Sequence, residues 1–182
     1  MGRNSFPMKL DFTRVQNLTS SATSQTFPNP MGPQTYGVLL TALGNVWVYF
    51  GGQSGPGIAS ASQTVATPGV FTTAVQAFAA GQPVYLSGIA PGGLTLGTVY
   101  YVIATGLTTT SVELATTPGG TGVQVTASAA CVINPLTAAT ATNSLLIKQT
   151  DFAEEYGISP GQYISVLENG TAGAINCVEL TH

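Results

Sequence analysis

The feature that most constrains the fold is a series of short strand-like segments between Phe71 and Ala127, separated by strong turn sequences. Two of these turns, Pro91-Gly92-Gly93 and Thr117-Pro118-Gly119-Gly120, combine the residues that most often interrupt regular structure. Branched and aromatic residues fill the segments between the turns, which is typical of a compact β-domain. The predicted strands cover residues 81–88, 99–104, 111–115 and 123–126.

The sequence on either side of this β-module predicts a second domain that the module interrupts. We expect an all-β fold in which residues 1–67 and 131–182 form a jelly-roll-like β-sandwich base and residues 68–130 form the inserted module. Two turn sequences in the base, Leu43-Gly44 and Asn169-Gly170, predict tight β-hairpins.

The N-terminal part of the base contains three further features. Met8, Leu10 and Phe12 alternate with polar residues, which predicts a strand with one buried face. Residues 17–33 are rich in Ser, Thr, Asn and Pro without periodicity, and we interpret them as an extended arm that reaches over a neighbouring subunit. Trp47, the only tryptophan, is expected to be a core anchor.

Charge is scarce, and its distribution excludes several classes of partner. Charged residues make up 6% of the 182 residues, and none lies between Arg14 and Glu113. The four basic residues form no cluster, which argues against binding to nucleic acid or to anionic lipid. No apolar run is long enough to span a bilayer, so we expect no membrane partner. A surface with so little charge is expected to meet other copies or another protein.

No catalytic, metal-binding or cofactor-binding residue is predicted. The single histidine, His182, is the last residue, where a chain normally frays. Asp151, Glu154 and Glu155 could bind calcium or serve as glycosidase carboxylates, but we interpret residues 151–157 as a solvated helical turn with acids near its N-terminus. We therefore expect a protein that is not an enzyme.

The cysteines and tyrosines complete the search for chemistry. Cys131 and Cys177 lie in apolar segments and are expected to be buried free thiols. Tyr85, Tyr100 and Tyr101 could form a patch on which sugars stack. Because strand residues alternate between faces, we expect one residue of the pair Tyr100 and Tyr101 in the core and the other available to a ligand.

Residues 81–127 carry a resemblance. Their order of motifs, GQPVYLSG, then LTLGTVYYV, then ELATTPGG, resembles a recurrent β-module of tailed-bacteriophage virion proteins and tail fibres. The flanking sequences GNVWVYFG and GQYISVLENGTAGAINCV are similar in style to small phage head and tail accessory proteins.

The resemblance implies a structural protein of a virion, similar to capsid decoration (cement) proteins. Such a protein would lie on the outer surface of the capsid, bind the major capsid protein and bridge capsid subunits. It would associate with itself as a homotrimer or a dimer, without a cofactor or catalytic residues. The alternative is a tail, tail-fibre or adaptor component whose module binds host glycans.

Overall fold

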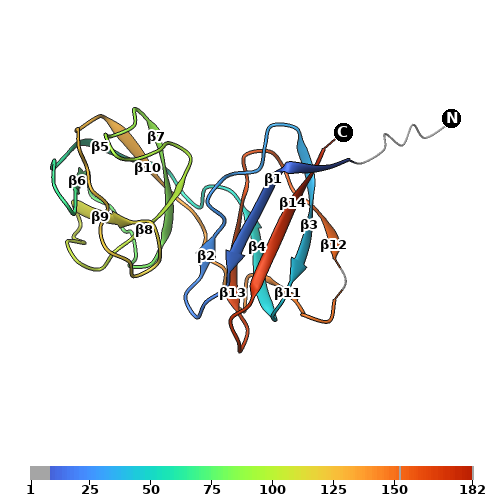
Figure 1. Cartoon of the computed structure of the whole chain (residues 1–182). Coiled ribbons are helices and arrows are strands. Elements are labelled where there is room, and N and C mark those ends of the chain that lie inside the picture. The colour runs from blue at the N-terminus through green and yellow to red at the C-terminus, as the bar shows by residue number, and fades with distance from the viewer. Residues whose placement is uncertain (1–8, 152, 182) are drawn as a thin grey trace.

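The computed structural model describes residues 9–151 and 153–181, and this part of the chain is all-β. Two four-stranded antiparallel sheets face each other in a sandwich, and a closed six-stranded barrel lies beside it (Figure 1). Strands from the two ends of the chain form the sandwich, whereas the middle of the chain forms the barrel. The predicted all-β class, sandwich base and inserted domain are confirmed.

Each sheet of the sandwich draws its strands from both halves of the chain. The first sheet has the order β1 (Lys9–Thr19), β14 (Ala174–Thr181), β3 (Thr35–Ala42) and β12 (Glu154–Gly157). The second sheet has the order β11 (Leu145–Ile147), β4 (Val46–Gly51), β13 (Tyr163–Glu168) and β2 (Gln25–Thr26).

The strand order is that of a jelly roll. Along the described chain, consecutive sandwich strands lie in opposite sheets at every connection except the one from β4 to β11, which are neighbours in the second sheet. The barrel is inserted at that connection. The two linkers run side by side there, since Gln53 pairs with Leu136 and the Ser54 N–H donates to the Pro135 carbonyl.

The two predicted hairpins are wrong for the same reason. Leu43-Gly44 connects β3 to β4, and the turn at Asn169-Gly170 connects β13 to β14, so both cross between the sheets. A turn sequence indicates that the chain reverses, but not whether the next strand joins the same sheet. The two connections also touch each other, because a Cβ on Gly173 would lie 2.7 Å from the Gly44 nitrogen.

The barrel is formed by a longer stretch of the chain than the predicted range 68–130. It closes in the order β10 (Cys131–Pro135), β5 (Ile58–Gln63), β6 (Val70–Thr73), β9 (Ser111–Ala115), β8 (Val99–Val102) and β7 (Pro83–Gly88). The strand expected at 123–126 does not form. Only isolated β-bridges form on either side of this stretch, at Gly122 and at Ala127. The Val125 side chain is buried in the barrel core.

The prediction of a helical turn at residues 151–157 is wrong, because residues 154–157 are strand β12, which pairs with β3, while residue 152 lies outside the described residues. The aromatic ring of Tyr156 packs against the sandwich core, with its centroid 5.4 Å from that of Phe50. The apolar contact and the ladder of backbone hydrogen bonds together outweigh the local preference for a helical start.

Residues 17–33 are not an arm. They include the end of β1 and all of β2, and they place Phe27 and Met31 in the sandwich core. The backbone of this segment is fixed along β13, since the Phe27 N–H donates to the Ile164 carbonyl at 2.9 Å and the Met31 N–H to the Gln162 carbonyl at 2.8 Å. Its lack of periodicity reflects an irregular buried path.

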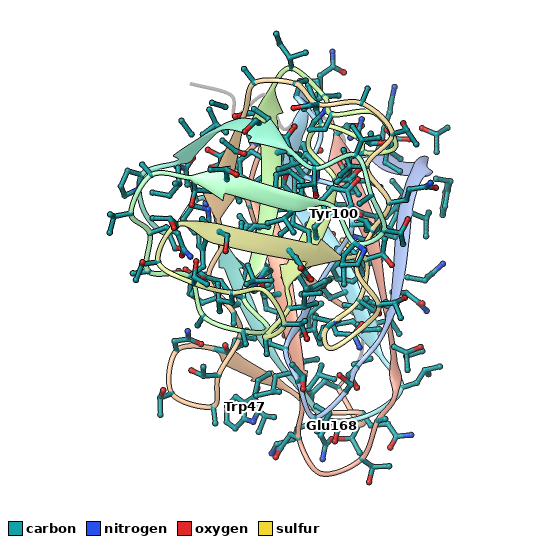
Figure 2. All side chains as sticks on the ribbon, turned by 90° about the vertical axis from the view of Figure 1, so that its left-hand side faces the viewer. Trp47, Tyr100 and Glu168 are labelled. Atoms are coloured by element: carbon teal, nitrogen blue, oxygen red, sulfur yellow. The ribbon has the colours of Figure 1, made fainter. Side chains whose placement is uncertain are left out.

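Trp47 is not the expected core anchor. It is half-buried on the outer face of the second sheet, whereas its neighbours Val46 and Val48 fill the core. Its strand partners are Leu146 and Leu167. Figure 2 shows Trp47 on the sandwich, away from Tyr100 among the barrel strands.

A cluster of tyrosines joins the barrel to the sandwich. The Tyr101 hydroxyl accepts a hydrogen bond from the Thr26 N–H at 2.7 Å and donates to the Thr26 carbonyl at 3.2 Å. Tyr163 of β13 stacks on Tyr85 with ring centroids 5.3 Å apart, and its hydroxyl donates to the Gly97 carbonyl at 2.7 Å. These contacts fix how the barrel is held on the sandwich.

We expect Tyr101→Phe to lower the free energy of unfolding by about 1–3 kcal/mol, because the buried backbone groups of Thr26 would lose their partner. Urea unfolding measures the change. Tyr49→Phe is the matched control, since the Tyr49 hydroxyl makes no hydrogen bond to another described residue, and it should change stability by less than about 0.5 kcal/mol. Equal effects of the two substitutions would contradict the role of Tyr101.

Both cysteines are buried free thiols, as predicted. Burial raises the pKa of Cys177 from 9.0 to about 12, and the nearby Glu179 carboxylate adds to the shift. The folded state therefore holds the thiol proton more tightly than the unfolded state. This contribution to stability is fully present below pH 9.0 and is lost as the pH rises through about 12.

We therefore expect the free energy of unfolding to fall above pH 9.0. The fall should be smaller in Cys177→Val than in the wild type, though not absent, because burial also raises the pKa of Tyr101. Urea unfolding across this pH range measures both. A Cys177 thiol that reacted with a thiol reagent at neutral pH as fast as a small free thiol would contradict the account.

Candidate interaction surfaces

Of the three carboxylates considered as a metal or glycosidase site, Asp151 and Glu154 make local hydrogen bonds. Asp151 Oδ2 accepts a hydrogen bond from the Lys148 N–H at 2.8 Å, and Glu154 Oε2 accepts one from the Tyr156 hydroxyl at 2.7 Å. Within residues 9–151 and 153–181, no group of three or more His, Cys, Asp or Glu side chains could hold a metal ion. His182 lies outside the described residues. No helix in the described part of the chain is long and apolar enough to cross a membrane.

The tyrosine pair does not offer a sugar-stacking surface. Tyr100 lies in the barrel core and its hydroxyl accepts a hydrogen bond from the Thr95 N–H at 2.9 Å. Tyr101 is buried against the sandwich. The prediction that one of the two is available to a ligand is therefore wrong. Tyr100 and Tyr101 do point to opposite faces of their strand, as strand alternation predicts. The outer face of the barrel, on which Tyr101 lies, is however covered by the sandwich.

A groove of about 450 Å³ lies where the barrel meets the sandwich. Its walls come from the linkers, from the turn before β7 and from the loop before β2, and they carry hydroxyl, amide and aliphatic groups without a charged side chain. Its lining contains no aromatic residue on which a sugar could stack. The groove therefore has the size of a small-molecule site but not its usual anchoring groups.

The most prominent exposed apolar surface belongs to β1, at the edge of the first sheet. Leu10, Phe12 and Val15 are all exposed, and the Phe12 side chain is 73% accessible. The predicted strand is therefore present, but Leu10 and Phe12 do not form a buried face; Met8 lies outside the described residues. Strand partners point to the same face of a sheet, so Val15, Val178 and Leu39 form one apolar row across the outer surface.

A wide bulge displaces Phe12 from the sheet. Asp11 pairs with Glu179, but the next partner of β14, Val178, pairs with Val15, so the residues between Asp11 and Val15 loop out of the ladder. Asp11 Oδ1 closes this loop by accepting hydrogen bonds from the Thr13 N–H at 3.0 Å and from its hydroxyl at 2.6 Å. These bonds hold the pKa of Asp11 below its usual value.

The bulge turns Arg14 towards a buried carboxylate. Arg14 Nε donates to Glu179 Oε1 at 3.0 Å, and the Glu179 side chain is only 1% exposed. The other oxygen, Oε2, accepts from the Gly32 N–H at 2.9 Å and from the Thr35 hydroxyl. A Cβ on Gly32 would lie 2.6 Å from Arg14 Cζ, so a side chain at this position would displace the guanidinium. One carboxylate thus anchors β1, β14 and the segment before β3.

Sequence reasoning missed both the β1 surface and its anchor. The alternation of Leu10 with polar neighbours resembles a half-buried strand whether the apolar face turns inward or outward. Glu179 follows the buried Cys177 by two residues, which puts a carboxylate on the core-facing side of the last strand. The alternation of this strand could therefore have indicated a buried carboxylate at Glu179. The cation that pairs with this carboxylate, Arg14, lies at the other end of the chain.

Comparison with protein-family models, curated proteins and solved structures finds no match in any of the three.

We expect Arg14→Met to lower the free energy of unfolding by about 1–3 kcal/mol, because the buried Glu179 carboxylate would lose its ion-pair partner. Lys9→Met, on the same strand but without an ion pair among the described residues, should cost less than about 0.5 kcal/mol. Urea unfolding measures both.

A double-mutant cycle provides the control for coupling. Arg14→Met and Glu179→Gln together should destabilise the protein by less than the sum of their separate effects. Strict additivity would show that the two side chains do not act as a pair.

Proposed function

We propose that this chain is a structural protein of a tailed-bacteriophage virion that attaches to the outside of the capsid and bridges its subunits. The sandwich binds the major capsid protein through the outer face of the first sheet, and the barrel projects away from the shell. The observation that carries this proposal is the exposed apolar strand β1, with Phe12 raised on an anchored bulge.

The chemistry of this surface fits docking onto protein. Aromatic and aliphatic side chains at the centre of a patch contribute most of the affinity at protein interfaces, and a polar rim usually surrounds them. Glu155 pairs with Leu39 and therefore continues the row formed by Val15, Val178 and Leu39 at one end. The anchored bulge presents Phe12 on a rigid element, so little conformational entropy is lost on binding.

The jelly roll is compatible with the proposal, since this architecture occurs in viral capsid proteins as well as in lectins. Architecture alone does not decide between those functions. The alternative of a glycan-binding tail component is less well supported, because Tyr100 and Tyr101 are internal and the groove between the domains has no aromatic platform.

Phe12→Ser should weaken attachment to shells of the major capsid protein by about tenfold or more, because the central aromatic group of the surface is removed. Co-sedimentation of the protein with purified shells over a range of concentrations measures the change. Phe12 is too exposed for the substitution to unfold the sandwich, which circular dichroism can verify.

Leu145→Ser is the matched control, since Leu145 is also an exposed apolar residue on an edge strand but lies in the second sheet. It should leave attachment unchanged. Undiminished attachment of Phe12→Ser would refute the role of β1, and failure of the wild-type chain to bind shells would refute the proposed function. Deletion of residues 1–33 is unsuitable as a test because it removes the core residues Phe27 and Met31.

A further inference from the structure

The turn that connects β13 to β14 contains the only asparagine in the chain that is followed by glycine, Asn169. Both Asn169 and Gly170 are exposed. Gly170 has a φ of 97°, a backbone conformation that favours glycine, and a Cβ built on it would meet no atom within 4 Å. The space around the peptide bond between these two residues is therefore open.

The groups on either side of this peptide bond are free to react with each other. The Asn169 side-chain amide makes no hydrogen bond to another described residue. The Gly170 N–H likewise donates to no group within residues 9–151 and 153–181. A backbone nitrogen and the carbonyl carbon of a side-chain amide, Cγ of Asn169, are thus neighbours, and no hydrogen bond within the described chain holds them apart.

Asn143 shows the opposite arrangement. It is also exposed, and a small residue, Ser144, follows it. Its Oδ1 accepts hydrogen bonds from the Thr140 N–H at 2.8 Å and from the Ser144 hydroxyl at 2.6 Å, and its Nδ2 donates to the Ala138 carbonyl at 3.1 Å. The Asn143 amide must break these bonds before it can turn towards the next backbone nitrogen.

We propose that Asn169 is a site of spontaneous deamidation. The Gly170 nitrogen attacks Asn169 Cγ, a bond forms between these two atoms, and the bond from Cγ to Nδ2 breaks. Ammonia leaves with the proton that the Gly170 nitrogen gives up, and a cyclic succinimide remains. Water then opens the ring at either carbonyl, which produces aspartate or isoaspartate. Water is the only co-reactant, and nothing is oxidised or reduced.

The reaction changes the turn in two ways. Either acid adds one negative charge, next to Glu168, to a chain whose net charge is −3. Isoaspartate also lengthens the main chain between residues 169 and 170 by one carbon atom. The Asn169 N–H donates to the Asn45 carbonyl at 2.8 Å, so the change falls where the two connections that cross between the sheets touch.

Peptide mapping by mass spectrometry tests the proposal on the full chain incubated at mildly alkaline pH. Aspartate and isoaspartate should accumulate at Asn169 about tenfold or more faster than at Asn143. Asn169→Gln should abolish the modification at this position, because its longer side chain closes the less favourable larger ring. Asn143→Gln is the matched control and should leave deamidation of Asn169 unchanged. Both residues are exposed, so neither substitution should unfold the sandwich.

The same measurement in urea separates the effect of the fold from that of the local sequence. Unfolding removes the hydrogen bonds of Asn143, so its rate should rise, whereas the rate at Asn169 should change by less than about tenfold. A larger rise at Asn169 would show that the fold protects it and would overturn the proposal. An unmodified Asn169, or an Asn143 that reacts as fast in the folded chain, would overturn it as well. These measurements involve no capsid shells and are independent of the proposed function.

Discussion

The hydroxyl of Tyr101 satisfies both backbone groups of Thr26, and the relation between the two domains depends on this contact. Strand β2 is only two residues long and lies at the edge of its sheet, where open N–H and carbonyl groups could recruit another strand. The tyrosine closes this edge with one donor and one acceptor. Stacking of Tyr85 on Tyr163 continues the same contact, so the barrel is held rigidly rather than tethered.

The rigid contact between the domains fixes the orientation of the charged sandwich relative to the uncharged surface of the barrel. Because the barrel cannot turn freely on the sandwich, the barrel and the β1 surface keep a fixed direction relative to each other. The sandwich carries the ion pair between Arg14 and Glu179 and the other charged groups, while the one acid of the barrel, Glu113, is buried.

The overall class could be predicted from local patterns, but the partners of strands and side chains could not. Turn sequences at Pro91-Gly92-Gly93 and the dense β-branched segments were sufficient for an all-β fold with an insertion. They did not show that the turns at Leu43-Gly44 and Asn169-Gly170 cross between sheets, because crossing is decided by the packing of both sheets around one core. Residues 17–33 looked like a loop since their few apolar anchors, among them Phe27, follow no period.

The interaction surfaces were harder to predict than the fold for a related reason. Period-two alternation identifies the two faces of β1 but not which of them the core covers, and the exposure of Phe12 depends on a bulge fixed by the distant Glu179. The tyrosine pair was identified correctly as a feature of opposite faces. The role of Tyr101 in joining the domains could not be predicted, because the local sequence does not show where the sandwich lies relative to the barrel.

Under the proposed function, the sandwich attaches to a capsid with the first sheet facing the shell. Cryo-electron microscopy of the virion that contains this chain tests it most directly. We expect density for the chain on the outer capsid surface, with β1 against the major capsid protein and the barrel directed outward. Density confined to the tail, or a barrel seated on the shell with the sandwich outward, would contradict it.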